Sequence, residues 1–284
     1  MTYESKARYF PVSPRPLKMV AGLSRFGADF GQGERDRRFF QLDSERPRYL
    51  AAKLRAPLER HLLAADDSEA LLVRTAALSW MRETLAREAP ELVVECECDA
   101  EARDPFDALA RTLQEDFCVF SAGDDDAGRA VLLDVRFPGG WRPEQLVDRD
   151  FQAIHAPVPG FVSHADAAKS MVRAMVERGP FVRFVWTLSS DDQLDHHPDA
   201  SARPSWERAE GAWLRVERQV TVPLPEARAS VFLIRTYNYD LVELAHEQRA
   251  CIMAALAAMP SDVKAYKGLP EPSVLSSALA RRPS

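Results

Sequence analysis

The sequence predicts an α+β fold, because helical patterns come first and antiparallel-looking strand patterns follow, with helices between the strands. Two observations support this prediction. Apolar residues recur at helical spacing in the first third of the chain, and short apolar runs bounded by turn residues follow it. Since 46% of the 284 residues are apolar, the chain can bury a large core.

The helices are predicted from apolar periodicity and from capping residues. They are expected over 48–63, 68–87, 105–114, 165–177 and 241–259. Leucines spaced four apart indicate the first helix, and Ser68 is positioned to cap the second. Asp240 with Glu243 forms a plausible cap for the last.

The strands are predicted from apolar runs bounded by turns. They are expected over 117–121, 129–137, 181–188, 212–222 and 229–237. A polar segment from Ser189 to Glu210 reads as a long loop, and loops of this length in compact domains are often functional.

The domain organisation is expected to be simple. We expect an extended N-terminal arm over 1–45, one α+β domain over 46–268 and a loosely ordered tail over 269–284. A formal net charge of -6 argues against a nucleic-acid-binding protein. The chain shows no secretory signal and no apolar stretch near the roughly 20 residues that span a bilayer, so we expect a cytoplasmic protein without membrane contacts.

His155 is the histidine best placed for chemistry. It stands before Ala-Pro-Val-Pro-Gly, and the two prolines predict an extended, rigid backbone there. A rigid segment presents an imidazole at small entropic cost, and neutral imidazole is the common proximal ligand of haem iron. A structural histidine is the alternative, and the residues alone favour it.

A second pair of histidines, His196 and His197, lies in the long polar loop beside Asp195. A metal site is conceivable there, but an exposed loop is favoured because no third ligand is evident. The four cysteines also lack zinc-ligand spacing.

Arg218 falls in an apolar stripe of its predicted strand, since side chains alternate between the two faces. Arg235 and Tyr237 share a face of the next strand. A buried guanidinium needs a partner. An internal ion pair and an anionic ligand such as a haem propionate are equally good interpretations.

Five segments in order resemble the haem-dependent oxidative N-demethylase family. They are Phe137–Glu144 (FPGGWRPE), Ile154–Gly160 (IHAPVPG), Leu214–Gln219 (LRVERQ), Ile234–Tyr237 (IRTY) and Tyr266–Gly268 (YKG). Their order and separations match over most of the chain, from about Pro16 to Gly268.

The resemblance implies a PAS-like domain that binds haem b and removes a methyl group from a small amine such as dimethylamine. The monooxygenase-type reaction would consume O2 and electrons and release formaldehyde. The electrons would come from NADPH through flavin and iron–sulfur groups of separate reductase subunits, because this chain has no motif for either group.

The resemblance also implies roles for residues. His155 would be the proximal iron ligand, and Arg218, Arg235 and Tyr237 would lie in or near the haem pocket and take part in catalysis. Trp186, with the two arginines, would contact the cofactor. The sequence departs from the family pattern at the residue before Trp186. Val185 occupies the position where the family pattern has Asn, which would affect the distal side of the haem.

Two alternatives to an enzyme fit the same residues. A PAS-like haem pocket also suits a non-catalytic sensor module, although this chain has no recognisable output domain. An accessory subunit that has lost haem would keep the fold and leave His155 packed.

Overall fold

The computed structural model describes residues 4–14, 22–159, 165–200 and 202–281. Its centre is a seven-stranded antiparallel sheet in the order β1-β5-β6-β7-β3-β4-β2. The strands are β1 (Ser24–Arg25), β2 (Leu62–Ala64), β3 (Asp116–Ser121), β4 (Arg129–Asp134), β5 (Phe181–Ser189), β6 (Trp213–Leu224) and β7 (Ala229–Asp240). With helices packed on this sheet, the α+β prediction is confirmed.

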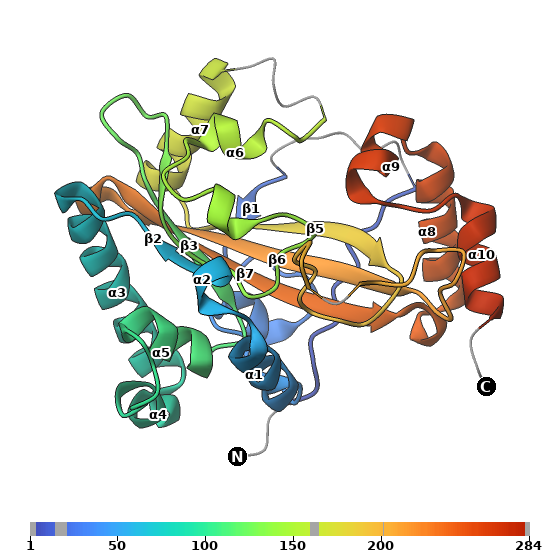
Figure 1. Cartoon of the computed structure of the whole chain (residues 1–284), viewed down its shortest axis with the longest axis horizontal. Helices are drawn as coiled ribbons and strands as arrows, with labels where there is room; N and C mark the ends of the chain where they lie inside the picture. Colours follow the sequence, from blue (N-terminus) through green and yellow to red (C-terminus); the bar gives the residue numbers. More distant parts are fainter. Residues whose placement is uncertain (1–3, 15–21, 160–164, 201, 282–284) are drawn as a thin grey trace.

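The helices occupy both sides of the sheet (Figure 1). They are α1 (Arg46–Arg55), α2 (Leu58–His61), α3 (Ser68–Glu88), α4 (Val93–Glu97), α5 (Pro105–Thr112), α6 (Phe151–His155), α7 (Ala165–Glu177), α8 (His246–Ala258), α9 (Ser261–Lys267) and α10 (Pro272–Ala280). In Figure 1, α3, α4 and α5 lie on one side of the sheet, and α6 and α7 lie on the other.

The two faces of the sheet differ in chemistry because side chains alternate along each strand. One face, here called the core face, carries Val182 of β5, Val220 of β6 and Leu233 of β7, which are paired across the strands or packed in one cluster. The other face, here called the polar face, carries Arg183 of β5 and Gln219 of β6, which are also a cross-strand pair.

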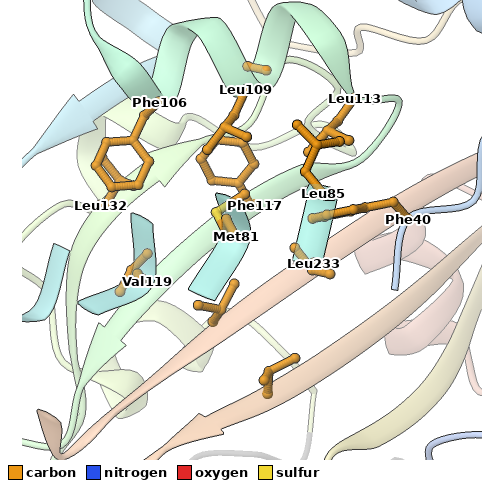
Figure 2. Packing of buried hydrophobic residues seen from close by; sticks show 14 of the residues in the cluster. Phe40, Met81, Leu85, Phe106, Leu109, Leu113, Phe117, Val119, Leu132 and Leu233 are labelled. Carbon is orange, nitrogen blue, oxygen red and sulfur yellow. The ribbon is translucent and has the colours of Figure 1, made fainter. Parts of the chain in front are cut away.

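The core face is covered by α3 and α5 at one end. Figure 2 shows Phe106 and Leu109 of α5, and Leu113 directly after it, pointing toward the sheet, with Met81 and Leu85 of α3 in the same cluster. At the other end of the same face, α8 and α10 pack against β6 and β7 in a second cluster. The core face is therefore the hydrophobic centre of the molecule.

The segment before α1 ties itself to the core face through buried polar contacts. Arg235 of β7 donates to Asp43 at 2.8 Å, and both side chains are almost fully buried. Tyr237 donates to Gln41, and the Tyr9 hydroxyl donates to Asp36 at 2.9 Å. These bonds fix the N-terminal segment against the sheet, although it has little regular secondary structure.

Three predictions about the helices need correction. The helix expected over 48–63 breaks between α1 and α2, because a residue before proline, here Ala56 before Pro57, favours extended backbone. The tail after 268 was predicted to be loosely ordered, yet α10 forms there and buries Leu275 and Ala278. The last long helix begins at His246, because Asp240 caps a short 3-10 turn instead.

Among the residues that the structure describes, no helix has the length and apolar character needed to cross a membrane.

The Arg235–Asp43 pair provides a test of the packing. Replacing Asp43→Ala would leave the Arg235 guanidinium buried without its carboxylate, which typically costs about 3–5 kcal/mol of folding free energy. Urea unfolding of the variant should show this loss. The matched change Glu34→Ala, which removes an exposed partner of Arg37, should leave the midpoint almost unchanged. Equal, small effects from both would contradict the role given to Asp43.

Candidate functional site

His155 is the last residue of α6, on the side of the sheet opposite α3 and α5. The Asp150 side chain caps this short helix by accepting from the Ala153 amide at 2.6 Å. The extended backbone predicted for His155 is therefore wrong. The prolines act two residues later, at Pro157, where they end the helix. Gly160 of the same motif lies outside the described residues.

The His155 ring has a defined tautomer. Its Nδ1 lies 2.8 Å from the carbonyl oxygen of Phe151. Since a carbonyl only accepts, Nδ1 carries the proton and Nε2 is the basic nitrogen. Burial lowers the pKa of His155, the bond to Phe151 raises it, and the positive charge of Arg183 lowers it further. The imidazole is therefore neutral at pH 7.

A line of polar side chains crosses the polar face beside α6. Arg183 Nε donates to Gln219 Oε1 at 2.6 Å, and Gln219 Nε2 donates to Glu217 Oε2 at 2.9 Å. Glu217 lies in turn 3.6 Å from Arg215 Nε. The order Arg183–Gln219–Glu217–Arg215 thus places one carboxylate and one amide between two guanidinium groups.

Arg215 anchors one end of this line. It is fully buried and donates to the carbonyl oxygens of Leu194 at 2.8 Å and Phe137 at 2.6 Å. These bonds also hold the long loop after β5 and the loop after β4 against the polar face. Glu217 is less enclosed, since its side chain is 21% exposed.

Glu217 lies where several separate segments meet. A Cβ built on Gly139 would lie 3.5 Å from Glu217 Oε1, an ordinary van der Waals contact, so the loop after β4 passes beside this carboxylate. The charge of Glu217 also reaches Tyr266 and Lys267 at the end of α9. Burial raises the pKa of Tyr266 and Glu217 raises it further, and Glu217 also acts to raise the pKa of Lys267. For Lys267 burial is the larger effect, and the pKa falls to about 8.

Next to the polar line, the same side of the sheet becomes apolar. Ile234 and Phe232 of β7 belong to a small cluster that also includes Ile154 of α6 and Trp141. The ring of Phe151 lies 4.1 Å from the His155 ring, measured between centroids. His155 therefore lies between an apolar wall and a charged line.

The structure separates His155 from four residues that were predicted to share its pocket. Arg218, Arg235, Tyr237 and Trp186 all lie on the core face. The expected alternation along β6 is correct, but His155 approaches the opposite face. The prediction of one common pocket is therefore wrong.

Each of the two core-face arginines has a structural environment. Arg235 pairs with Asp43, an internal ion pair of the kind considered from the sequence, although Asp43 was not foreseen as the partner. Arg218 donates to the carbonyl oxygen of Arg38 at 3.0 Å and lies over the ring of Phe26. These contacts hold the N-terminal segment rather than a ligand.

Sequence reasoning missed Arg183, Glu217 and Gln219 as site residues. The signal was present, because Arg215, Glu217 and Gln219 alternate with the apolar positions of β6. The position of Val185, where the family pattern has Asn, also belongs to this region: the register pairs Val185 with Glu217. The side of the sheet that α6 covers could not be read from the pattern.

His196 and His197 of the long loop have tautomers in which Nδ1 accepts a hydrogen bond and Nε2 carries the proton, so Nε2 cannot bind a metal ion. The Asp199 amide donates to Nδ1 of His197 at 3.1 Å, so Nε2 carries the proton and points to Glu144. Nδ1 of His196 faces the Arg203 guanidinium at 3.3 Å in the same manner. Among the described parts of the chain, no group of three or more His, Cys, Asp or Glu side chains is arranged to hold a metal ion.

Comparison with known families gives one match. The family model for the haem-dependent oxidative N-demethylase, alpha subunit-like, matches residues 74–273. The match extends from α3 into α10 and includes His155, the polar face and the loops that meet at Glu217. It covers well over half of the chain. The chain therefore belongs to the haem-dependent oxidative N-demethylase, alpha subunit-like family.

Proposed function

We propose that this chain is the haem-binding catalytic subunit of an oxidative N-demethylase that acts on a small methylated amine, such as dimethylamine. The family match supports a haem-dependent oxidative enzyme of this type. The observation that carries the assignment to a site is His155, whose Nδ1 proton is directed to the Phe151 carbonyl. A histidine that donates through Nδ1 to a backbone carbonyl has the tautomer of a proximal iron ligand bound through Nε2.

The residues around His155 fit haem b in chemical character. The lowered pKa of His155 keeps the imidazole neutral, as iron ligation requires. Ile154, Phe232 and Ile234 offer apolar surface to a macrocycle and would exclude water from it. Arg183 supplies positive charge on the same side of the sheet. When bound there, haem b would supply the O2-dependent oxidation.

The protein's own part in the reaction is positioning and polarity. The Phe151 carbonyl would fix the orientation of the His155 ring. Glu217, at 21% exposure, is the acidic group of the polar face that could attract a protonated amine. In a PAS-like arrangement the sheet would form one wall of the pocket.

The overall reaction balances only with an external electron source. Dimethylamine, O2, two electrons and two protons would give methylamine, formaldehyde and water. The family's description names an alpha subunit, and we propose that separate reductase subunits pass electrons from NADPH through flavin and iron–sulfur groups. We expect the complex to work in the cytoplasm.

Two other functions remain as defined alternatives. A haem sensor would bind the cofactor without turnover, and an accessory subunit would not bind it. The polar face favours the enzyme, because a charged line beside the expected haem position suits a polar substrate better than a diatomic gas.

Haem binding is the first prediction of this proposal. Titration of the chain with haemin should produce a Soret band, and His155→Ala should weaken binding by more than about tenfold, the loss typical even of an outer partner of a metal ligand. His246→Ala, which removes an exposed histidine, serves as the control. Wild-type affinity in the His155 variant would show that this residue is not the ligand.

Haem ligation should also resist acid. Because the folded-state pKa of His155 lies below 6.5, its imidazole stays neutral as the pH falls through that value. The Soret band should therefore persist as the pH falls through 6.5, and protons should compete with iron only below the lowered pKa. A loss of the band centred above pH 6.5, with the fold intact by circular dichroism, would contradict this protonation state.

Turnover is the prediction that separates the enzyme from its alternatives. The haem-loaded chain, given O2, NADPH, a flavoprotein reductase and a [2Fe–2S] ferredoxin, should convert dimethylamine into methylamine and formaldehyde in equal amounts. The His155→Ala variant should be inactive. A protein that binds haem, accepts electrons and still forms no formaldehyde from dimethylamine or trimethylamine would favour the sensor.

A further inference from the structure

Arg183 is partly buried, and it differs from the fully buried Arg136 and Arg235 in the partner that it uses. Arg136 pairs with Asp134 and Asp107, and Arg235 pairs with Asp43. Arg183 instead donates to a neutral amide, Gln219 Oε1. Within the described ranges, no carboxylate lies within ion-pair distance of its guanidinium.

The neighbouring carboxylate is already engaged elsewhere. Glu217 accepts from Gln219 at 2.9 Å and lies 3.6 Å from Arg215. The charge of Arg183 is therefore not matched by contact with an acid. Arg218 on the core face also lacks an acid, but it is buried against the N-terminal segment, whereas Arg183 is only partly buried. Burial lowers the pKa of Arg183, and the distant Glu217 only partly offsets this effect. A bound anion would accept hydrogen bonds from Arg183 and so replace the water that burial removes.

Gln219 fixes the direction of this guanidinium. Since the Gln219 amide nitrogen donates to Glu217, its oxygen must face Arg183. The bond to Gln219 uses Nε of Arg183 and leaves its two terminal nitrogens out. Neither terminal nitrogen is both buried and without a hydrogen-bond partner. The fork of terminal nitrogens is thus the part of Arg183 that can meet a planar anion such as a carboxylate.

The position of Arg183 relates this cation to His155. Both lie on the same side of the sheet. Arg183 is paired across the strands with Gln219, and Gln219 is paired with Ile234. Ile234 packs in one cluster with Ile154, the residue before His155. In haem, the carboxylates project from one edge of a rigid ring that carries the iron at its centre. A guanidinium on the same side of the sheet as the iron ligand can therefore meet a carboxylate at the edge of such a molecule.

We propose that Arg183, oriented by Gln219, binds a propionate carboxylate of the haem held by His155. This inference rests on the proposed function. It assigns Arg183 to cofactor binding, and it gives Glu217 and Gln219 the role of positioning residues that hold the guanidinium in place.

The test compares haem with haem dimethyl ester, which has the same ring and iron but no propionate charge. Both ligands are titrated into the wild-type chain, Arg183→Gln, Arg183→Lys and the control Arg173→Gln. Arg173 is an exposed arginine of α7 that bonds to Asp126, so its loss changes the net charge equally. Affinity is read from the Soret band.

The wild-type chain should prefer haem over the ester by roughly 10- to 100-fold, the range expected for a charged hydrogen bond. Arg183→Gln should lose this preference while its affinity for the ester stays unchanged. Arg183→Lys should keep part of the preference, because it retains the charge without the planar fork. The control should behave as wild type.

Two results would overturn the inference. If Arg183→Gln weakened haem and ester equally, the residue would act only through the fold. If the wild-type chain bound both ligands equally, no propionate would be recognised. Absence of a Soret band with either ligand in every variant would instead reject haem binding itself, and with it the proposed function.

Discussion

The alternation of side chains along β6 is the constraint on which the rest of the structure depends. Leu214, Val216 and Val220 point into the core, while Glu217 and Gln219 point to the polar face from between them. A register shift of one residue would exchange the two sets, burying the acid and exposing the apolar side chains. The packing that stabilises the sheet therefore also positions the polar line. This is why a loosely enclosed group such as Glu217 can have a defined orientation.

The arginines of the sheet serve two purposes: some hold the fold together, and one is assigned to a ligand. On the core face, Arg235 and Arg218 hold the N-terminal segment through Asp43 and the Arg38 carbonyl. Burying such groups is stabilising only when their hydrogen bonds are made, so the arm and the sheet depend on each other. On the polar face, Arg183 has an amide as its partner. The structural arginines are buried against the N-terminal segment, whereas Arg183, which we assign to a ligand, is partly buried on the side of the sheet that α6 covers.

Much of the fold could be predicted from the sequence, and the errors have physical causes. Periodicity located the five longer strands, β3 to β7, and the helix at 165–177, because burial of one face imposes it directly, but it did not locate the short β1 and β2. The core side of β6 was also correct. What the pattern could not give was which face α6 covers, since that depends on contacts between segments far apart in sequence. For this reason Arg218, Arg235 and Tyr237 were placed with His155, whereas Arg183 was overlooked. His155 itself was found from local chemistry, but its helical backbone was missed because Asp150 caps a helix that ends before the prolines act.

The central claim is that haem binds between His155 and the polar face of the sheet. A crystal structure of the haem-loaded chain tests it most directly. The account predicts iron bound to Nε2 of His155, the macrocycle against Phe232 and Ile234, and a propionate at Arg183. Haem bound on the core face beside Arg218 and Arg235, or iron held by another side chain, would contradict it.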